Sequence, residues 1–226
     1  MTVETIYNEL VRPAQPLVDG FREVLREYSP SCLVTDGQRR AGAIGGLLPV
    51  RHEHKVAGPA LTVNLSIDDL VDCMPVLARA RSGDIVVIAC HEARRTAMWG
   101  GLMSTLSMKA GIAAGVVDGA IRDVDEIRDL NFPVWYRGTV PRPSPTAVHN
   151  RTEPVQVNVP VVVDGQIIHP GDILVADENG IAVVPAGTAE EVLAGARHQI
   201  AKEKVIREKI ASGATVHELL TEFGHL

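Results

Sequence analysis

The spacing of hydrophobic residues predicts helices near the N-terminus and strands after them. Apolar residues recur at helical spacing over residues 16–28 and predict a helix that Pro30 would end. Residues 29–50 are rich in glycine and show little periodicity, so they predict turns. Residues 56–65 then predict a strand, and a short helix that Ser66 could cap follows it.

In the middle of the chain, short continuous apolar runs alternate with helical patterns. Such runs are typical of buried parallel strands, and they occupy residues 85–90, 113–119 and 133–138. Between them the pattern predicts a helix over about 96–110, with Leu102 and Leu106 four apart and Gly111 just past its end. A second, amphipathic helix is predicted over 123–130. This β-α-β-α-β order predicts a parallel sheet with helices on its faces.

The last third of the chain predicts antiparallel hairpins and a closing helix. Residues 164–165 (Asp-Gly) and 178–180 (Glu-Asn-Gly) are tight-turn signals between apolar runs. A long helix is predicted over 188–211, with Gly213 past its end. Since no linker separates these parts, residues 1–226 are predicted to form one α/β domain.

Composition excludes several classes of protein. The net charge of −6 has the wrong sign for a protein that clamps phosphate backbones, and aromatic residues are only 4%, so we expect no nucleic-acid partner. The chain shows no secretory signal and no apolar run of the roughly 20 residues that a spanning helix needs, so we expect no membrane association. Three cysteines without CxxC spacing favour reduced thiols, and we expect a cytoplasmic protein.

The segment DGAIRD, residues 118–123, is the densest candidate for chemistry. It ends a predicted parallel strand and opens a helix, which is where α/β sheets bind ligands and where free N–H groups can donate hydrogen bonds to an anion. Arg122 could hold a carboxylate bidentately, and Asp123 could supply an oxygen ligand to Mg²⁺ or Mn²⁺. Two structural alternatives are open. Asp123 and Glu126 have nearly the spacing of a capping box, and Arg122 could form only a surface ion pair.

Adjacent glycines, Gly100 and Gly101, form a second candidate. Each costs about 1 kcal/mol relative to alanine inside a helix, and close approach of a ligand to the backbone is one reason to retain them. Unusual loop dihedrals or tight helix packing are equally good reasons. Two weaker candidates are the histidines of His52-Glu53-His54, which would share one face of an extended strand, and His91-Glu92, which follows a buried strand.

Three classes of catalytic motif are missing from the sequence. It contains no G-x-S-x-G elbow, no G-x-G-x-x-G loop after a first strand and no Walker loop. All of the lysines lie in polar or helix-end contexts, which disfavours Schiff-base chemistry.

Three runs of the sequence carry a family resemblance: VAGPALTV, then WGGLMSTLSMKAGIAAGVVDGAIRDVDEIRDLNFPVWYRG, then VPVVVDGQIIHPGDILVADENGIAVVP. On these runs, residues 56–186 resemble the RraA-like family. This family includes metal-dependent 4-hydroxy-4-methyl-2-oxoglutarate / 4-carboxy-4-hydroxy-2-oxoadipate aldolases, and some members decarboxylate oxaloacetate. The resemblance implies a layered α/β/β fold of the swivelling-domain type. It also implies a homotrimer or homohexamer with sites at subunit interfaces.

The resemblance further implies a set of site residues. Asp123 would hold Mg²⁺ or Mn²⁺, and Arg122 would lie near the keto oxygen of a pyruvate-like moiety. The backbone of the segment from Gly100 and Gly101 to Leu102 and Met103 would receive the substrate carboxylate. Glu203, on the C-terminal helix, would reach the site of a neighbouring subunit.

One departure from the family concerns Gly101, because many aldolase members have an acid directly after the WG pair. Restoring it by Gly101→Asp should raise aldolase turnover if that acid matters. The function predicted is therefore a divalent-metal-dependent, pyruvate-releasing aldolase for 4-hydroxy-2-oxo acids with oxaloacetate decarboxylase activity. Asp123 favours it over a non-catalytic regulator of ribonuclease activity, and the missing glycine-rich loop disfavours a methyltransferase. The sequence does not name the substrate or the metal.

Overall fold

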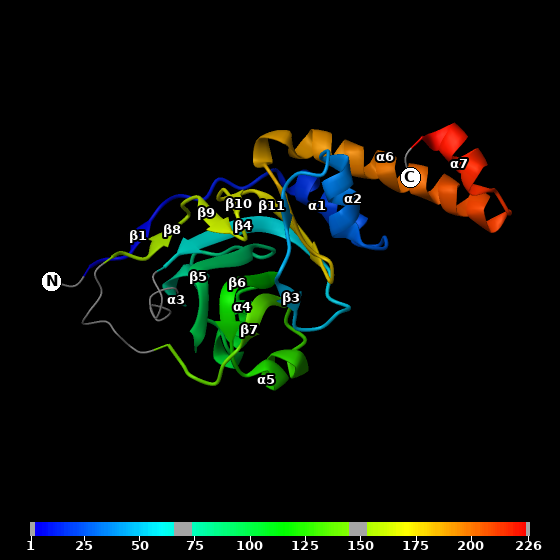
Figure 1. Cartoon of the computed structure of the whole chain (residues 1–226). Helices are drawn as coiled ribbons and strands as arrows, with labels where there is room; N and C mark the ends of the chain where they lie inside the picture. Colours follow the sequence, from blue (N-terminus) through cyan, green and yellow to red (C-terminus); the bar gives the residue numbers. More distant parts are fainter. Residues whose placement is uncertain (1–2, 66–73, 145–152, 225–226) are drawn as a thin grey trace.

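The computed structural model describes residues 3–65, 74–144 and 153–224, and its centre is a ten-stranded mixed sheet (Figure 1). The ten strands are β1 (Ile6–Tyr7), β2 (Ala43–Ile44), β3 (Leu48–Pro49), β4 (Val56–Asn64), β5 (Ile85–Ala97), β6 (Ala114–Ile121), β7 (Val134–Thr139), β8 (Gln156–Val157), β11 (Ile173–Asp177) and β12 (Gly180–Val184). A separate hairpin joins β9 (Val161–Val163) to β10 (Gln166–Ile168). The helices are α1 (Gln15–Val24), α2 (Pro30–Gly37), α3 (Met74–Leu77), α4 (Gly101–Lys109), α5 (Val124–Asp129), α6 (Ala189–Ala211) and α7 (Val216–Phe223).

The predicted β-α-β-α-β unit is confirmed. Strands β4, β5, β6 and β7 pair in parallel in that order, with α4 and α5 as the connections from β5 to β6 and from β6 to β7. All eight residues of β6 are buried, as the continuous apolar run predicts. The carboxyl ends of these strands therefore share one edge of the sheet.

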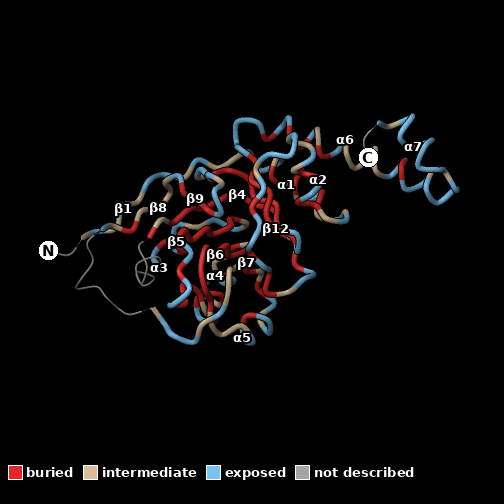
Figure 2. The backbone as a smooth tube through the Cα atoms, in the orientation of Figure 1, coloured by how far each residue is buried: buried red, intermediate tan, exposed pale blue. Residues whose placement is uncertain are grey.

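Strand β4 connects two layers of the molecule. Its first residues pair antiparallel with β11, and its last residues pair in parallel with β5. The buried residues form three cores. One lies between the parallel strands and the helices α4 and α5, and a second lies between the parallel strands and β9–β12. The third lies between β11–β12 and the helices α1, α2 and α6. Figure 1 shows α1, α2 and α6 on one side of the strands and α4 and α5 on the other, and Figure 2 shows the buried residues concentrated along the strands. The molecule is a mixed α/β fold with a central sheet and helices.

The C-terminal hairpins form as predicted. Asp164 and Gly165 both have positive φ between β9 and β10, which is the geometry of a type I′ turn. Strands β11 and β12 pair antiparallel around Glu178 and Asn179. Helix α6 matches the predicted 188–211, but it does not close the chain.

The helix that follows, α7, begins at a capping box of Thr215 and Glu218. The second half of α6 and all of α7 extend beyond the rest of the molecule (Figure 1). We call residues 197–223 the α6–α7 arm.

Two predictions near the N-terminus were wrong. Helix α1 ends at Val24 rather than residue 28, and Pro30 begins α2 instead of only ending α1. Proline is favoured in the first turn of a helix, since its missing N–H has no partner there. The stretch predicted as turns, residues 29–50, therefore holds α2 together with β2 and β3.

The predicted helix over 96–110 was also partly wrong. Strand β5 continues to Ala97, and α4 begins only at Gly101. Leu102 and Leu106, whose spacing predicts a buried face, are 73% and 41% exposed. Gly111 has the expected positive φ after the helix. Of the helix predicted after β4, the structure describes α3, and Ser66 lies outside the described residues.

Candidate functional site

Backbone hydrogen bonds join the residues before α4 to the end of β6. The N–H of Met98 donates to the carbonyl of Ala120 at 2.8 Å, and the N–H of Arg122 donates to the carbonyl of Trp99 at 3.0 Å. The buried Trp99 indole donates to Ser104 Oγ at 2.7 Å, which fixes it against the first turn of α4. The start of α4 therefore lies beside Arg122, as the shared strand edge predicts.

The first turn of α4 leaves backbone donors free. Gly100 is its N-cap, and the first intrahelical bond runs from the N–H of Ser104 to the carbonyl of Gly100 at 3.0 Å. Within the part of the chain that the structure describes, the N–H groups of Leu102 and Met103 have no acceptor. Free N–H groups at a helix N-terminus can bind a carboxylate.

The Asp123 side chain, just before α5, points toward the first turn of α4. The residue has a left-handed backbone (φ 55, ψ 41), and its Oδ2 accepts a hydrogen bond from the N–H of Gly101 at 3.2 Å. Its side chain forms no cap on α5, so the capping-box alternative is wrong. A Cβ at Gly100 would lie 2.8 Å from Asp123 Oδ2, which is closer than real Cβ contacts. Glycine at 100 therefore lets this carboxylate approach the helix start.

Arg122 lies beside the same carboxylate. Its Nε is 3.4 Å from Asp123 Oδ2, and its side chain is 39% exposed. A single contact of this length at the surface contributes little to stability. The ion pair therefore forms, but stability does not account for an arginine at this position. A hollow of about 290 Å³ adjoins the pair and is lined also by Thr139 and Pro141.

The donor set fits a divalent cation with few protein ligands. No hydrogen bond reaches Asp123 Oδ1 from the residues that the structure describes, so this oxygen can coordinate. Among the same residues, no group of three or more His, Cys, Asp or Glu side chains could hold a metal ion. Zinc sites need three or four such ligands, whereas Mg²⁺ is held by one or two carboxylates with water and substrate oxygens.

A family model described as RraA-like: Aldolase/RraA matches residues 31–183. The chain belongs to the RraA-like family. A relative from Halalkalibacterium halodurans named "Putative 4-hydroxy-4-methyl-2-oxoglutarate aldolase" is 35% identical over 164 residues, which cover 73% of this chain and 75% of the relative.

Several solved structures share the fold. An uncharacterized protein from Pseudomonas syringae pv. tomato has a TM-score of 0.80 at 27% identity, covering 96% of this chain and 98% of that one. Streptomyces coelicolor RraAS2 has a TM-score of 0.72 at 27% identity, covering 88% and 100%. RraAS2 is described as an unusual member of the RNase ES inhibitor RraA protein family.

Glu203 lies elsewhere in this RraA-like chain. It is on α6, which packs on α2, whereas Arg122 and Asp123 lie beside α4 (Figure 1). Its carboxylate accepts hydrogen bonds from Gln199 and Arg207 on the same helix. Within one chain, therefore, Glu203 does not reach the site.

The histidine candidates do not form a metal site either. Residues 51–53 turn rather than extend, so His52 is exposed while His54 is buried and bonded to Asn131 at 3.1 Å. His91 and Glu92 are part of β5 and not a loop after it, at an irregularity where both have positive φ. Glu92 faces Arg137 and not Arg122.

The sequence analysis missed a buried ion pair on the other face of β6. Arg137 donates to Asp118 at 2.5 Å, with Glu92 and Asp164 near the same guanidinium. Burial raises the pKa of Asp118 above its ordinary value, although Arg137 acts in the opposite direction. In the sequence, the only signal of this ion pair is the presence of a charged residue inside each of two apolar runs.

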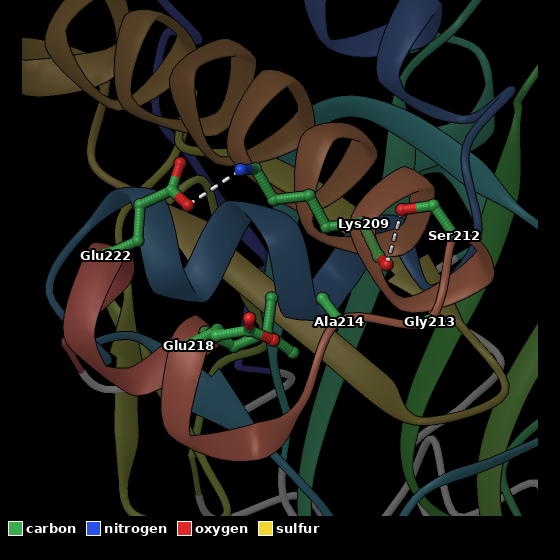
Figure 3. Close-up of a pocket in the computed structure, with 7 residues that line it drawn as sticks. Lys209, Ser212, Gly213, Ala214, Glu218 and Glu222 are labelled. Atoms are coloured by element: carbon green, nitrogen blue, oxygen red, sulfur yellow. Dashed lines mark hydrogen bonds and ion pairs between the residues drawn. The ribbon is translucent and has the colours of Figure 1, made fainter.

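A cavity of about 420 Å³ lies between α6 and α7 (Figure 3), and these helices are apart from α4 and α5 (Figure 1). Lys209 at its wall donates to Glu222 at 2.7 Å, and Ser212 donates to the Lys209 carbonyl, so these polar groups are already paired.

In the described residues, no helix is long and apolar enough to cross a membrane.

Proposed function

We propose that this RraA-like protein is a divalent-metal-dependent lyase that releases pyruvate from 4-hydroxy-2-oxo acids such as 4-hydroxy-4-methyl-2-oxoglutarate, and that it decarboxylates oxaloacetate. The observation that carries the proposal is the convergence at the start of α4. There Arg122, Asp123 and the free N–H groups of Leu102 and Met103 lie together. A 2-oxo acid presents a carboxylate beside a keto oxygen, and this set of groups complements both.

Each group has a separate task in the proposed reaction. The N–H groups of Leu102 and Met103 hold the substrate carboxylate, which orients the keto group toward Arg122. As the bond between C3 and C4 breaks, its electrons move onto the keto oxygen, and the Arg122 guanidinium stabilises the developing negative charge. The proton of the 4-hydroxyl leaves to water as C4 becomes the carbonyl carbon of the second product, and C3 then takes up a proton to give pyruvate.

Asp123 holds the proposed metal, either Mg²⁺ or Mn²⁺. When bound, such a cation acts as a Lewis acid toward the keto oxygen and the carboxylate. Asp123 is suited to this because one of its oxygens is fixed by Gly101 while the other is free. The same arrangement would serve oxaloacetate decarboxylation, because that reaction also develops negative charge on the keto oxygen.

We also propose that the protein assembles as a homotrimer or homohexamer, with Glu203 completing the site of a neighbouring subunit. Exposed apolar residues support an assembly: Leu102, Leu106 and Met108 on α4, and Val205, Ile210, Val216 and Leu220 on the α6–α7 arm. Apolar surface of this kind commonly marks an interface.

The deciding experiment is an assay of pyruvate release coupled to an NADH-consuming enzyme. Oxaloacetate and 4-hydroxy-4-methyl-2-oxoglutarate are each supplied with Mg²⁺, with Mn²⁺ and with chelator. Turnover of both substrates that chelator abolishes is the expected result. Turnover of oxaloacetate alone would retain the decarboxylase and overturn the aldolase. No turnover of either would overturn the lyase and favour a regulator that acts by binding another protein.

The matching variant is Asp123→Asn, since asparagine tolerates the left-handed backbone of residue 123. Metal-dependent turnover should be abolished, while the free energy of unfolding stays within about 1–2 kcal/mol of the unaltered protein. Asp129→Asn, an exposed acid at the end of α5, is the control and should retain turnover. Full activity of Asp123→Asn would remove Asp123 from the metal site.

A further inference from the structure

A hollow lies past the carboxyl ends of β6 and β7. Its volume is about 290 Å³, and it is lined by residues 121–125 and 139–141. Ile121 at the end of β6 pairs with Thr139 at the end of β7, and the N–H of Val140 donates to the carbonyl of Ile121 at 3.1 Å. These bonds hold the two strand ends side by side. The hollow therefore opens at the edge of the sheet where α/β folds bind ligands.

Arg122 lies between this hollow and the first turn of α4. A Cβ at Gly100 would lie 3.3 Å from Arg122 Cγ, so the arginine side chain runs close over the start of α4. Arg122 and Asp123 also line the hollow. In the proposed function, the N–H groups of Leu102 and Met103 hold the substrate carboxylate, and the keto oxygen lies at Arg122. This order directs the next carbons of the substrate, C3 and C4, past Arg122 and toward the hollow.

The walls of the hollow carry more negative than positive charge. Of its described lining residues, Arg122 is the only cation, and its Nε already lies 3.4 Å from Asp123 Oδ2. Asp125 is an exposed acid in the first turn of α5, and its side chain forms no hydrogen bond or ion pair with the described residues. The next cation along the chain, Arg142, does not line the hollow. An anionic group that enters the hollow would therefore meet two carboxylates and no free cation.

The other lining residues are uncharged. Ile121, Val124, Val140 and Pro141 are apolar, and Thr139 is an exposed residue with a neutral hydroxyl. Apolar walls favour an apolar group, because contact between them removes surface from water. A carboxylate gains nothing from such walls and loses part of its hydration. The hollow thus suits an uncharged branch.

We infer that the hollow receives the branch on C4 of the substrate and selects 4-hydroxy-2-oxo acids in which this branch is uncharged. The inference rests on the proposed lyase function and names its substrate class. Dicarboxylic acids with an apolar C4 branch are preferred to tricarboxylic acids with a carboxymethyl branch. The two classes share the 2-oxo acid end, the 4-hydroxyl and one carboxylate on C4, so only the branch distinguishes them. Asp125 and Thr139 are the residues that determine this specificity, since one repels a carboxylate and the other offers it no charge.

The ratio of kcat/KM for two substrates tests the selection. 4-Hydroxy-4-methyl-2-oxoglutarate has a methyl branch and cleaves to two molecules of pyruvate. 4-Carboxy-4-hydroxy-2-oxoadipate has a carboxymethyl branch and cleaves to pyruvate and oxaloacetate. Initial rates are measured with the products separated by chromatography, so that each turnover is counted once. The unaltered protein should favour the methyl substrate by at least about tenfold. An equal or reversed preference would overturn the inference.

Two substitutions change the charge of the hollow in the same direction. Asp125→Asn removes a negative charge and should shift the ratio toward the carboxymethyl substrate about three- to fivefold. Thr139→Lys adds a cation and should shift it about tenfold. The controls are Asp129→Asn at the other end of α5 and Ser82→Lys before β5, exposed positions that do not line the hollow. They make matching charge changes and should leave the ratio unaltered. No shift for Asp125→Asn and Thr139→Lys, or equal shifts for the controls, would overturn the inference.

Pyruvate itself is an internal control, because it has no C4. As a product inhibitor it should bind Asp125→Asn and Thr139→Lys as it binds the unaltered protein. An inhibition constant that changes in step with the ratio would assign the effect to the 2-oxo acid end, and would overturn the inference. The proposed function fails in a different way. Release of pyruvate from both substrates with equal efficiency overturns only the selection, whereas no release from either substrate with Mg²⁺ or Mn²⁺ overturns the lyase and the selection together.

Discussion

The side chain of Arg122 crosses Gly100, and its guanidinium is held beside Asp123 by geometry that a lysine cannot reproduce. A Cβ at Gly100 would lie 3.3 Å from Arg122 Cγ and 3.4 Å from its Nε, so the planar group lies close over the backbone. Lysine carries a point charge, whereas the planar guanidinium of arginine can donate two parallel hydrogen bonds. We expect Arg122→Lys to lower kcat/KM by about thirtyfold, equivalent to roughly 2 kcal/mol.

The control for this prediction is Arg26→Lys, an exposed residue that follows α1 and lies outside the α6–α7 arm. It makes the same chemical change far from the site and should leave kcat/KM unaltered. Steady-state kinetics of pyruvate release compares the two variants. Unaltered kinetics for Arg122→Lys would contradict a role for the guanidinium on the keto oxygen.

The buried pair of Asp118 and Arg137 predicts a pH-dependent stability. Burial raises the pKa of Asp118 in the folded protein, so the folded state holds that proton to higher pH than the unfolded chain does. Ionisation of this group therefore removes stability as the pH rises through that interval. Arg137 limits the loss by pairing with the carboxylate.

Removal of the arginine should enlarge this loss. We expect Arg137→Met to lower the free energy of unfolding at neutral pH by about 3–5 kcal/mol, because it leaves a buried carboxylate unpaired. The deficit should shrink as the pH falls toward about 4 and Asp118 takes up its proton. Urea denaturation across this range measures it. Adding Asp118→Asn should remove the pH dependence of the deficit, and a deficit independent of pH would contradict the argument.

Residues of the site were predictable where one strand end determined them. Arg122, Asp123 and the Gly100–Gly101 pair follow two parallel strands of one sheet, and such strand ends meet at one edge. Glu126 has the spacing of a capping-box partner in the sequence, whereas in the structure its carboxylate lies near Gly101 because α4 packs against α5. The Asp118–Arg137 pair depends on the register of β6 and β7 in the same way.

Among the elements, α2 and α6 cross at a contact between two glycines. A Cβ on Gly195 would lie 2.5 Å from the carbonyl oxygen of Gly37, and a Cβ on Gly37 would lie 2.5 Å from the N of Ala196. Both neighbours are backbone atoms, which cannot move aside as a side chain can. The approach of the two helices therefore requires glycine on both.

This contact predicts an effect opposite to helix propensity. Alanine at 195 should favour the helix by about 1 kcal/mol, but pushing α6 away from α2 costs roughly 1–3 kcal/mol. We expect Gly195→Ala to lower the free energy of unfolding by about 1 kcal/mol. Gly187→Ala, where nothing lies within 4 Å of the new Cβ, is the control and should be neutral. Urea denaturation decides, and a stabilised Gly195→Ala would contradict the close crossing.

The elements that the sequence predicted well have an internal period or a sharp turn. Buried strands such as β6, the type I′ hairpin and α6 show their pattern locally. Helix α2 was missed because Pro30 was taken only as the end of the preceding helix, although proline is also favoured in the first turn of a helix. Helix α4 was misplaced because its apolar spacing belongs to an exposed face, which sequence cannot distinguish from a buried one.

At the scale of the whole molecule, the site and the α6–α7 arm lie on opposite sides of one chain (Figure 1). If Glu203 acts at a site built around Asp123, the two residues must come from different subunits. A closed ring allows this, since each subunit gives its arm to one neighbour and receives an arm from the other. Mutations in the two residues should therefore complement each other.

We expect Asp123→Asn and Glu203→Gln each to lose most turnover when expressed alone. Co-expression should restore activity, because a mixed assembly contains sites with an intact Asp123 from one subunit and an intact Glu203 from its neighbour. Random mixing makes about a quarter of the sites intact. Pyruvate release by the co-purified assembly, with its mass measured by light scattering, is the readout. Loss of turnover in both single variants without recovery on mixing would place Glu203 outside the shared site, and full activity of Glu203→Gln alone would remove it from the reaction.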